Sequence, residues 1–202
     1  MDECIRRSAE AQEKGVEYMT LGILGTDRDA RTGPSFIPSG SKSVFDTVEP
    51  LLNKVACEVD HHACVGYVGS GMIAVLAKQA IDALENGEWQ LVAEMFDVMR
   101  LARMSNQEMA SSFSQWATSD ETPLFETVSV ILEKKDTDVD GCKPSDNFLI
   151  DRIADVPPSM KLPADWSSLS PSVEESVSIP ASAVDLRFVA YDKETRVKRF
   201  VE

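Results

Sequence analysis

The sequence is poor in the features that mark nucleic-acid binding, disulfide frameworks and membrane spans. Lys and Arg number only 20 against 34 Asp and Glu, for a net charge of −14, and this charge repels nucleic-acid backbones and anionic membranes. The four cysteines form no Cys-x-x-Cys pair, which is typical of reduced thiols in a cytosolic protein. No apolar run approaches the length of a membrane span, and no basic, apolar leader opens the sequence. We therefore expect a cytoplasmic protein with no nucleic-acid and no membrane partner.

Histidine is equally scarce, with two residues in the chain, and this limits the metal sites that the sequence can offer. The stretch His61-His62-Ala63-Cys64 has the residue types of metal ligands but lacks the second pair that a tetrahedral zinc site needs. Residues 136–142, DTDVDGC, are similar to a calcium loop without its closing glutamate. We expect polar turns at both places and no bound metal.

The first 70 residues alternate between helical and strand-like patterns. Helix formers fill residues 3–14, Gly15 follows as a stop, and residues 16–24 are strand-like. Residues 21–40 then pass into a glycine- and proline-containing loop, of the kind that allows close approach to a ligand or simply makes a turn-rich connection. A helix is expected over 43–54, with Pro50 marking an N-terminal turn or a kink, and short strands over 55–68, with a turn at Asp60-His61.

From Gly71 onward the apolar residues recur at helical spacing. We expect a helix with an interruption near Asn86-Gly87, and a capping box of Ser105 and Glu108 that starts the next helix. Further helices are expected over 123–135 and 146–154. An irregular proline-rich stretch over 157–180 is expected to precede a last helical pattern over 183–200. The predicted fold is thus an α/β remnant over residues 1–70 followed by an all-α domain over residues 71–202.

Lys78 and Glu85 are the residues of the predicted helix that could carry acid–base chemistry. They are seven residues apart, so both side chains leave one face of the helix. A lysine near an acid in a cleft can act as a base and acid pair beside a carbonyl group. A solvated helix face with ordinary charges explains the same pattern. The residues alone leave both interpretations open.

Five segments, taken in order, resemble decarboxylating 6-phosphogluconate dehydrogenase. They are GILGTDRDARTGPSFIPSG from Gly22, GEWQLVAEMFDVMR from Gly87, SNQEM…W at 105–116, LIDRIAD at 149–155 and AVDLRFVAYDKETR at 183–196. The resemblance implies that residues 1–70 are the C-terminal part of a Rossmann-like NADP-binding domain without its GxGxxG unit. It also implies that residues 71–202 are a truncated form of the family's helical domain. The family's reaction is the NADP-dependent oxidative decarboxylation of 6-phosphogluconate in the pentose phosphate pathway.

The resemblance also assigns site residues one at a time. The family motif KxxHNxxEY falls on Lys78, Ile81, Asp82, Glu85 and Asn86 in the preferred register. This register retains the family's lysine base and glutamate acid, whereas an alternative register would put Val75 at the lysine position. The expected catalytic residues are Lys78 and Glu85, and the expected substrate-binding residues are Gly25, Asp82, Ser167 and Arg187.

Other matched positions depart from the family and shape the expected function. Leu24 and Thr26 flank Gly25 where the family has Ser-Gly-Gly, and Asp165 stands where a lysine contacts the substrate phosphate. We expect a truncated, degenerate relative without native activity, with no cofactor for this chain alone, present as a homodimer or with an intact relative. The alternative is a cofactor-independent enzyme that uses Lys78 and Glu85 to isomerise, enolise or decarboxylate a small carbonyl compound or sugar acid. A partial gene product is the third possibility.

Overall fold

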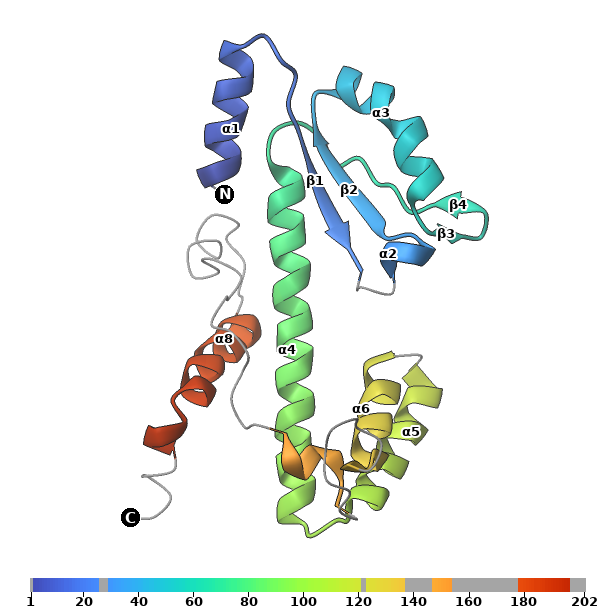
Figure 1. The fold of residues 1–202 in the computed structure, drawn as a ribbon, viewed down its shortest axis with the longest axis vertical. Helices are drawn as coiled ribbons and strands as arrows, with labels where there is room; N and C mark the ends of the chain where they lie inside the picture. Colours follow the sequence, from blue (N-terminus) through green and yellow to red (C-terminus); the bar gives the residue numbers. More distant parts are fainter. Residues whose placement is uncertain (1, 26–28, 121–122, 137–146, 154–177, 197–202) are drawn as a thin grey trace. The chain divides into compact units, whose positions relative to one another are not determined.

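The computed structural model describes residues 2–25, 29–120, 123–136, 147–153 and 178–196 (Figure 1). The chain divides into two compact units, Met1–Glu85 and Asn86–Glu202. The long helix α4 (Ile73–Leu101) begins in the first unit and ends in the second. The division after residue 70 that we drew from the sequence stays a prediction, and each unit is described below by itself.

The first unit opens with the predicted helix and strand. Helix α1 spans Asp2–Glu13, and Gly15 follows with a left-handed φ of 65°. Strand β1 (Met19–Leu24) pairs antiparallel with β2 (Ser35–Gly40), and the short helix α2 (Asp29–Thr32) lies between them in the chain (Figure 1). The predicted loop is therefore wrong over residues 35–40, because pairing with β1 and burial of this segment outweigh its glycine and proline content.

Helix α3 contributes to the core of this unit, and a small hairpin with exposed residues follows it. Helix α3 (Lys42–Val55) contains Pro50 and buries Phe45, whose ring stacks on that of Tyr67 with centroids 4.9 Å apart. Strands β3 (Glu58–Val59) and β4 (His62–Ala63) pair antiparallel. The predicted turn between them is confirmed, since Asp60 and His61 take the positive φ angles of a tight hairpin turn, 50° and 64°.

The second unit is helical, as the sequence indicates. Helices α5 (Asn106–Asp120) and α6 (Pro123–Glu133) pack together, followed by the 3-10 turn η2 (Leu149–Arg152) and helix α8 (Ser178–Tyr191). Its core consists of Met99, Met109, Ala110, Phe113 and Leu132. The helix predicted over 146–154 is thus only one 3-10 turn, since residues 147–148 and 153 lie outside it.

The start of α5 confirms the predicted capping box. The Ser105 backbone N–H donates to the Glu108 carboxylate at 2.7 Å, and the Glu108 backbone N–H donates to the Ser105 hydroxyl at 3.3 Å. These bonds satisfy backbone donors that the helix itself leaves unpaired. They also lower the pKa of Glu108, first through the backbone N–H and then through the hydroxyl of Ser105.

The predicted interruption of α4 near Asn86-Gly87 is wrong, because the helix continues through both residues. Gly87 is buried, and a Cβ atom placed on it would lie 3.4 Å from the Ile179 side chain of α8. The glycine therefore serves close packing within the second unit and does not end the helix.

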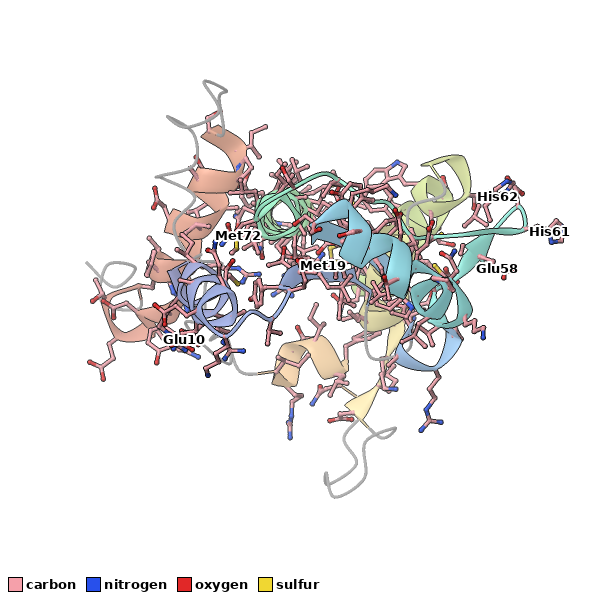
Figure 2. The ribbon with its side chains drawn as sticks, turned by 90° about the horizontal axis from the view of Figure 1, so that it is seen from above. Glu10, Met19, Glu58, His61, His62 and Met72 are labelled. Atoms are coloured by element: carbon pink, nitrogen blue, oxygen red, sulfur yellow. The ribbon has the colours of Figure 1, made fainter. Side chains whose placement is uncertain are left out.

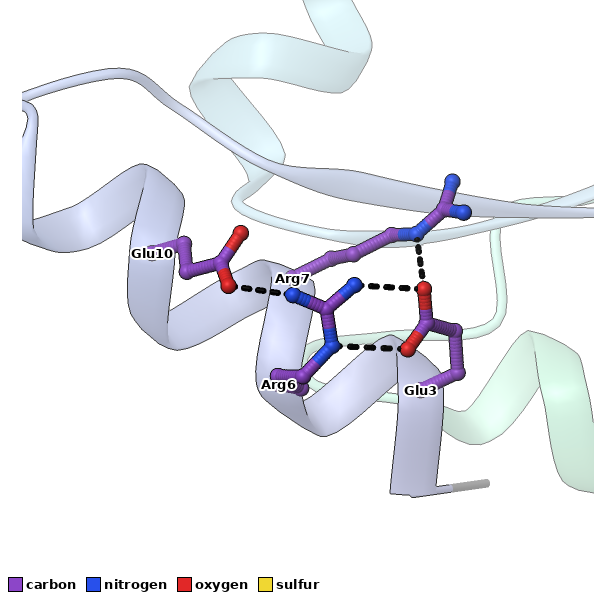
Figure 3. A network of polar contacts seen from close by, with 4 residues as sticks. All are labelled: Glu3, Arg6, Arg7 and Glu10. Carbon is purple, nitrogen blue, oxygen red and sulfur yellow. Dashed lines mark hydrogen bonds and ion pairs between the residues drawn. The ribbon is translucent and has the colours of Figure 1, made fainter.

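The exposed face of α1 carries a network of ion pairs (Figure 3). Glu3 accepts hydrogen bonds from the Arg6 guanidinium at 2.7 and 2.6 Å and from Arg7 at 2.8 Å, and Arg6 also pairs with Glu10. The bonds from Arg6 and then Arg7 lower the pKa of Glu3 from 4.5 to about 2. Since all four side chains are exposed, the network orders the helix surface and adds little to overall stability.

This network predicts how α1 responds to acid. Because the pKa of Glu3 is depressed, its stabilisation is present above pH 4.5 and is lost as the pH falls through about 2. Arg6→Ala should raise the pKa of Glu3 toward its ordinary value, as measured by NMR titration of the carboxyl carbon. Lys14→Ala, which changes a lysine beyond the end of α1, is the matched control. An unchanged Glu3 titration in Arg6→Ala would contradict the network.

Candidate functional site

Helix α4 carries Lys78 and Asp82 on adjacent turns, and the two side chains form an ion pair. The Lys78 Nζ atom donates to Asp82 Oδ1. The side chains are 34% and 30% exposed, so the pair lies at the surface and contributes modestly to folding. Its chemical importance is that a carboxylate holds the ammonium group of the predicted base.

Glu85 lies on the same face of α4 as Lys78 but does not approach it closely. Seven residues correspond to an axial separation of about 10 Å along a helix. Glu85 is exposed and belongs to the last turn of the first unit. A direct proton transfer between the two side chains is excluded by this spacing, whereas a small molecule lying along the helix could contact both.

Buried Ser39 fixes the start of α4 and thereby the position of Lys78. The Ser39 hydroxyl donates to the Gly71 carbonyl at 3.0 Å and accepts from the Ala74 backbone N–H at 2.9 Å. It also shares a hydrogen bond of 2.7 Å with the hydroxyl of Thr20. One side chain of β2 thus joins β1, β2 and the first turn of α4. Sequence reasoning missed this residue, because a single serine in a sequence does not indicate which distant residues its hydroxyl will contact.

Gly25 lies apart from these residues of α4, in a pocket of about 320 Å³ at the end of the β1–β2 sheet. The pocket is lined by Leu24, Gly25, Asp29, Thr32, Gly33, Pro34, Ser35 and Cys57. These residues come from the end of β1, the β1–β2 connection, the start of β2 and the segment between α3 and β3, and α4 supplies none of them. In this pocket, as its described residues line it, Gly25 is not joined by Lys78, Asp82 or Glu85.

Asp29 gives this pocket an acidic wall. Gly25 has a φ of 138°, and a Cβ atom placed on it would meet Asp29 Cβ at 2.9 Å and Asp29 Oδ2 at 3.1 Å. Only glycine allows the carboxylate to lie so close to the backbone here. A negative charge in the wall disfavours an anionic ligand. Sequence reasoning missed Asp29, although it follows Gly25 by four residues.

Arg187 lies in the second unit, on α8, where its guanidinium stands over the indole ring of Trp89 at 5.8 Å from the centroid. Such a cation–π contact attracts the guanidinium group to the face of the ring. Trp89 is half exposed, at 52%. The structure thus gives the predicted phosphate-binding arginine an aromatic support that the sequence did not indicate.

Some of the sequence predictions fall outside the part of the chain that is described. Ser167, Asp165, Thr26 and residues 137–142 of the calcium-like stretch are among them. The predicted association, the cytoplasmic location and the roles given to individual residues stay predictions.

His61 and His62 lie at the β3–β4 turn, where both are exposed (Figure 2). Within residues 2–25, 29–120, 123–136, 147–153 and 178–196, His, Cys, Asp and Glu nowhere gather in a group of three or more that could hold a metal ion. Over the same ranges, even the 29-residue α4 is not apolar enough to cross a bilayer.

Two family models match the chain. The NAD binding domain of 6-phosphogluconate dehydrogenase matches residues 1–69, and the 6-phosphogluconate dehydrogenase C-terminal domain matches residues 77–200. The chloroplastic decarboxylating 6-phosphogluconate dehydrogenase 1 of Arabidopsis thaliana is 34% identical over 195 residues, which are 95% of this chain and 38% of the relative. The enzyme of Lactococcus lactis subsp. cremoris is 29% identical over 202 residues, 97% of this chain and 41% of the relative.

Solved structures agree with these matches. The structure of Plasmodium falciparum 6-phosphogluconate dehydrogenase superposes with a TM-score of 0.84 at 31% identity, over 96% of this chain and 41% of that one. A 3-hydroxyisobutyrate dehydrogenase from Salmonella typhimurium superposes with a TM-score of 0.63 at 14% identity, over 91% of this chain and 58% of that one, a likeness of fold alone. The chain spans about two-fifths of the length of the curated relatives it matches. The family resemblance and the predicted fold class are confirmed.

The pocket geometry predicts a sharp contrast between two glycines. Gly33 has a φ of 106°, and a Cβ atom there would lie 2.4 Å from the Cys57 backbone nitrogen. Gly33→Ala should therefore lower the free energy of unfolding by about 1–3 kcal/mol or more. Gly66→Ala is the matched control, because Gly66 has no left-handed φ and nothing lies within 4 Å of its added Cβ. Chemical denaturation measures the free energy of unfolding of both variants. Equal losses of stability would contradict the close approach of Gly33 to the Cys57 backbone.

Proposed function

Because the chain belongs to the 6-phosphogluconate dehydrogenase family, we propose that it is a divergent member that keeps the family's lysine and glutamate without the native dehydrogenase activity. The family's reaction transfers a hydride from 6-phosphogluconate to NADP and releases carbon dioxide. The observation that carries the proposal is the ion pair between Lys78 and Asp82. The family motif has a neutral asparagine at the position of Asp82.

The proposed loss begins with the base. Hydride transfer from a carbon that bears a hydroxyl group requires a nearby group to take the hydroxyl proton. Lys78 stands at the family's base position, yet its ammonium group donates to a carboxylate one helical turn away. A neutral amide in that place would bind substrate and lysine without adding a charge. The carboxylate instead engages the lysine ammonium group as one half of an ion pair.

Negative charge near the site also disfavours the native substrate, which carries a phosphate and a carboxylate. Two like charges 4 Å apart repel by about 1 kcal/mol even in water. Asp82 on α4 and Asp29 in the pocket beside Gly25 both present such a charge. The ligand that suits these surroundings is a less anionic small carbonyl compound or sugar acid.

The geometry of the β1–β2 sheet argues against binding of the cofactor. A dinucleotide pyrophosphate binds where a glycine turn joins a parallel strand to a helix N-terminus. Strands β1 and β2 are antiparallel, and the backbone N–H at the start of α4 already donates to Ser39. We therefore propose that these 202 residues do not take up NADP by themselves.

The direct test uses the purified chain with NADP and 6-phosphogluconate. The absorbance of NADPH should rise no faster than in a mixture without protein, and calorimetric titration with NADP should give no saturable heat. The intact enzyme of a relative serves as the positive control. Robust NADPH formation would overturn the proposal, and saturable NADP uptake would overturn its cofactor part.

A second test isolates the charge at position 82. Asp82→Asn should raise the affinity for 6-phosphogluconate roughly fivefold, since it removes about 1 kcal/mol of repulsion. Asp97→Asn, an exposed change on the same helix, is the matched control with the same change in net charge. Isothermal titration at low salt measures both. An equal effect of the two substitutions would mean that only net charge matters, which contradicts the role given to Asp82.

A further inference from the structure

Two cysteines face each other at the open end of the β3–β4 hairpin. Cys57 precedes β3 and Cys64 follows β4. The ladder pairs Val59 with His62 and Glu58 with Ala63, so its next step sets Cys57 opposite Cys64. The Cys64 backbone N–H donates to the Cys57 carbonyl at 2.8 Å, which extends the pairing to these two residues.

The two thiols lie on the same side of the hairpin. They share a side-chain hydrogen bond, which is the first cause of a raised pKa of the Cys64 thiol, with burial as the second. Facing residues of an antiparallel pair have Cα atoms about 4.5–5.5 Å apart. A disulfide accepts Cα separations of about 4.4–6.8 Å. The backbone therefore needs no rearrangement to accept a bond between the two sulfur atoms.

We propose that Cys57 and Cys64 form a reactive dithiol site, which is converted to an intrachain disulfide by exchange with a low-molecular-weight disulfide. In the first step the Cys57 thiolate attacks one sulfur of the small disulfide, and one thiolate leaves. In the second step the Cys64 thiolate attacks the Cys57 sulfur of the mixed disulfide, and the second thiolate leaves. The small disulfide is reduced to two thiols, and the two cysteines are oxidised.

The surroundings assign the attacking role to Cys57. Cys57 is a wall residue of the pocket beside Gly25, so a small molecule in that pocket lies next to this residue. Its Sγ atom shares a hydrogen bond of 3.4 Å with the Ser35 hydroxyl, a polar neighbour for a thiolate. Cys64 is not among the residues that line this pocket, so the small disulfide meets Cys57 first. Cys64 thus acts as the resolving thiol.

Oxidation at this site would alter the pocket itself. The Cys57 backbone N–H donates to the Pro34 carbonyl at 3.1 Å, and the Phe36 N–H donates to the Cys64 carbonyl at 2.8 Å. The dithiol is therefore tied to β2 and to the segment that lines the pocket. A disulfide would remove the thiol that meets Ser35. This inference is independent of the proposed function, because it concerns thiol chemistry and not turnover of a sugar acid.

The experiment treats the full, reduced chain with bis(2-hydroxyethyl) disulfide, a small disulfide without charge, then alkylates the remaining thiols and digests after Glu58 and Asp60. Cleavage there places the two cysteines on separate peptides that only a disulfide can join. The expected product is a chain lighter by two hydrogen atoms, with the Cys57 and Cys64 peptides linked. Both cysteines alkylated, or links to Cys4 or Cys142 instead, would overturn the proposal.

Two variants make the order of steps testable. Cys64→Ser should accumulate a stable mercaptoethanol adduct on Cys57, at least tenfold more than the wild type, because the resolving thiol is gone. Cys4→Ser is the matched control, since it removes a half-buried thiol on α1 and should leave the link intact. Circular dichroism checks that each variant is folded. A Cys64→Ser protein that is folded and carries no adduct on Cys57 would refute the attacking role.

Discussion

The buried hydroxyl of Ser39 is the contact on which the first unit depends. It joins a neighbouring strand through Thr20, the chain before α4 through the Gly71 carbonyl, and the first turn of α4 through the Ala74 N–H. A polar group with no exposed surface must have its hydrogen bonds satisfied within the protein, or its burial costs free energy. The hydrogen bonds that satisfy the Ser39 hydroxyl fix the position at which α4 begins beside β2. The position of Lys78 in the second turn of α4 follows from it.

The same helix carries the residues that the sequence predicts as acid and base. Lys78 and Glu85 keep the spacing that places both on one helix face, but the carboxylate of Asp82 lies between them and engages the lysine. The pocket that holds Gly25 is built from other elements and carries its own carboxylate at Asp29. Acidic side chains therefore lie at two separate places in the first unit.

Much of the fold could be predicted because local rules act over a few residues. The capping box at Ser105, the hairpin turn at Asp60-His61 and the end of α1 before Gly15 each depend on backbone preferences of two to four residues. The errors arose where contacts between residues distant in sequence determine the local secondary structure. Gly87 reads as a break, yet Ile179 packs against it, and Ser35–Gly40 reads as a loop, yet it pairs with β1. Single-sequence patterns contain neither neighbour.

The sequence by itself determined the family, the order of an α/β part before a helical part, and the same-face spacing of Lys78 and Glu85, because motifs and helical periodicity are written in the order of residues. Only the tertiary structure decided the partners of the side chains. Lys78 pairs with Asp82, and Asp29 lies against Gly25. The Arg187 guanidinium lies over the Trp89 ring, and the Cys57 and Cys64 thiols share a hydrogen bond. Such pairings depend on distances in space, and several of them join residues from different elements that the chain order keeps apart.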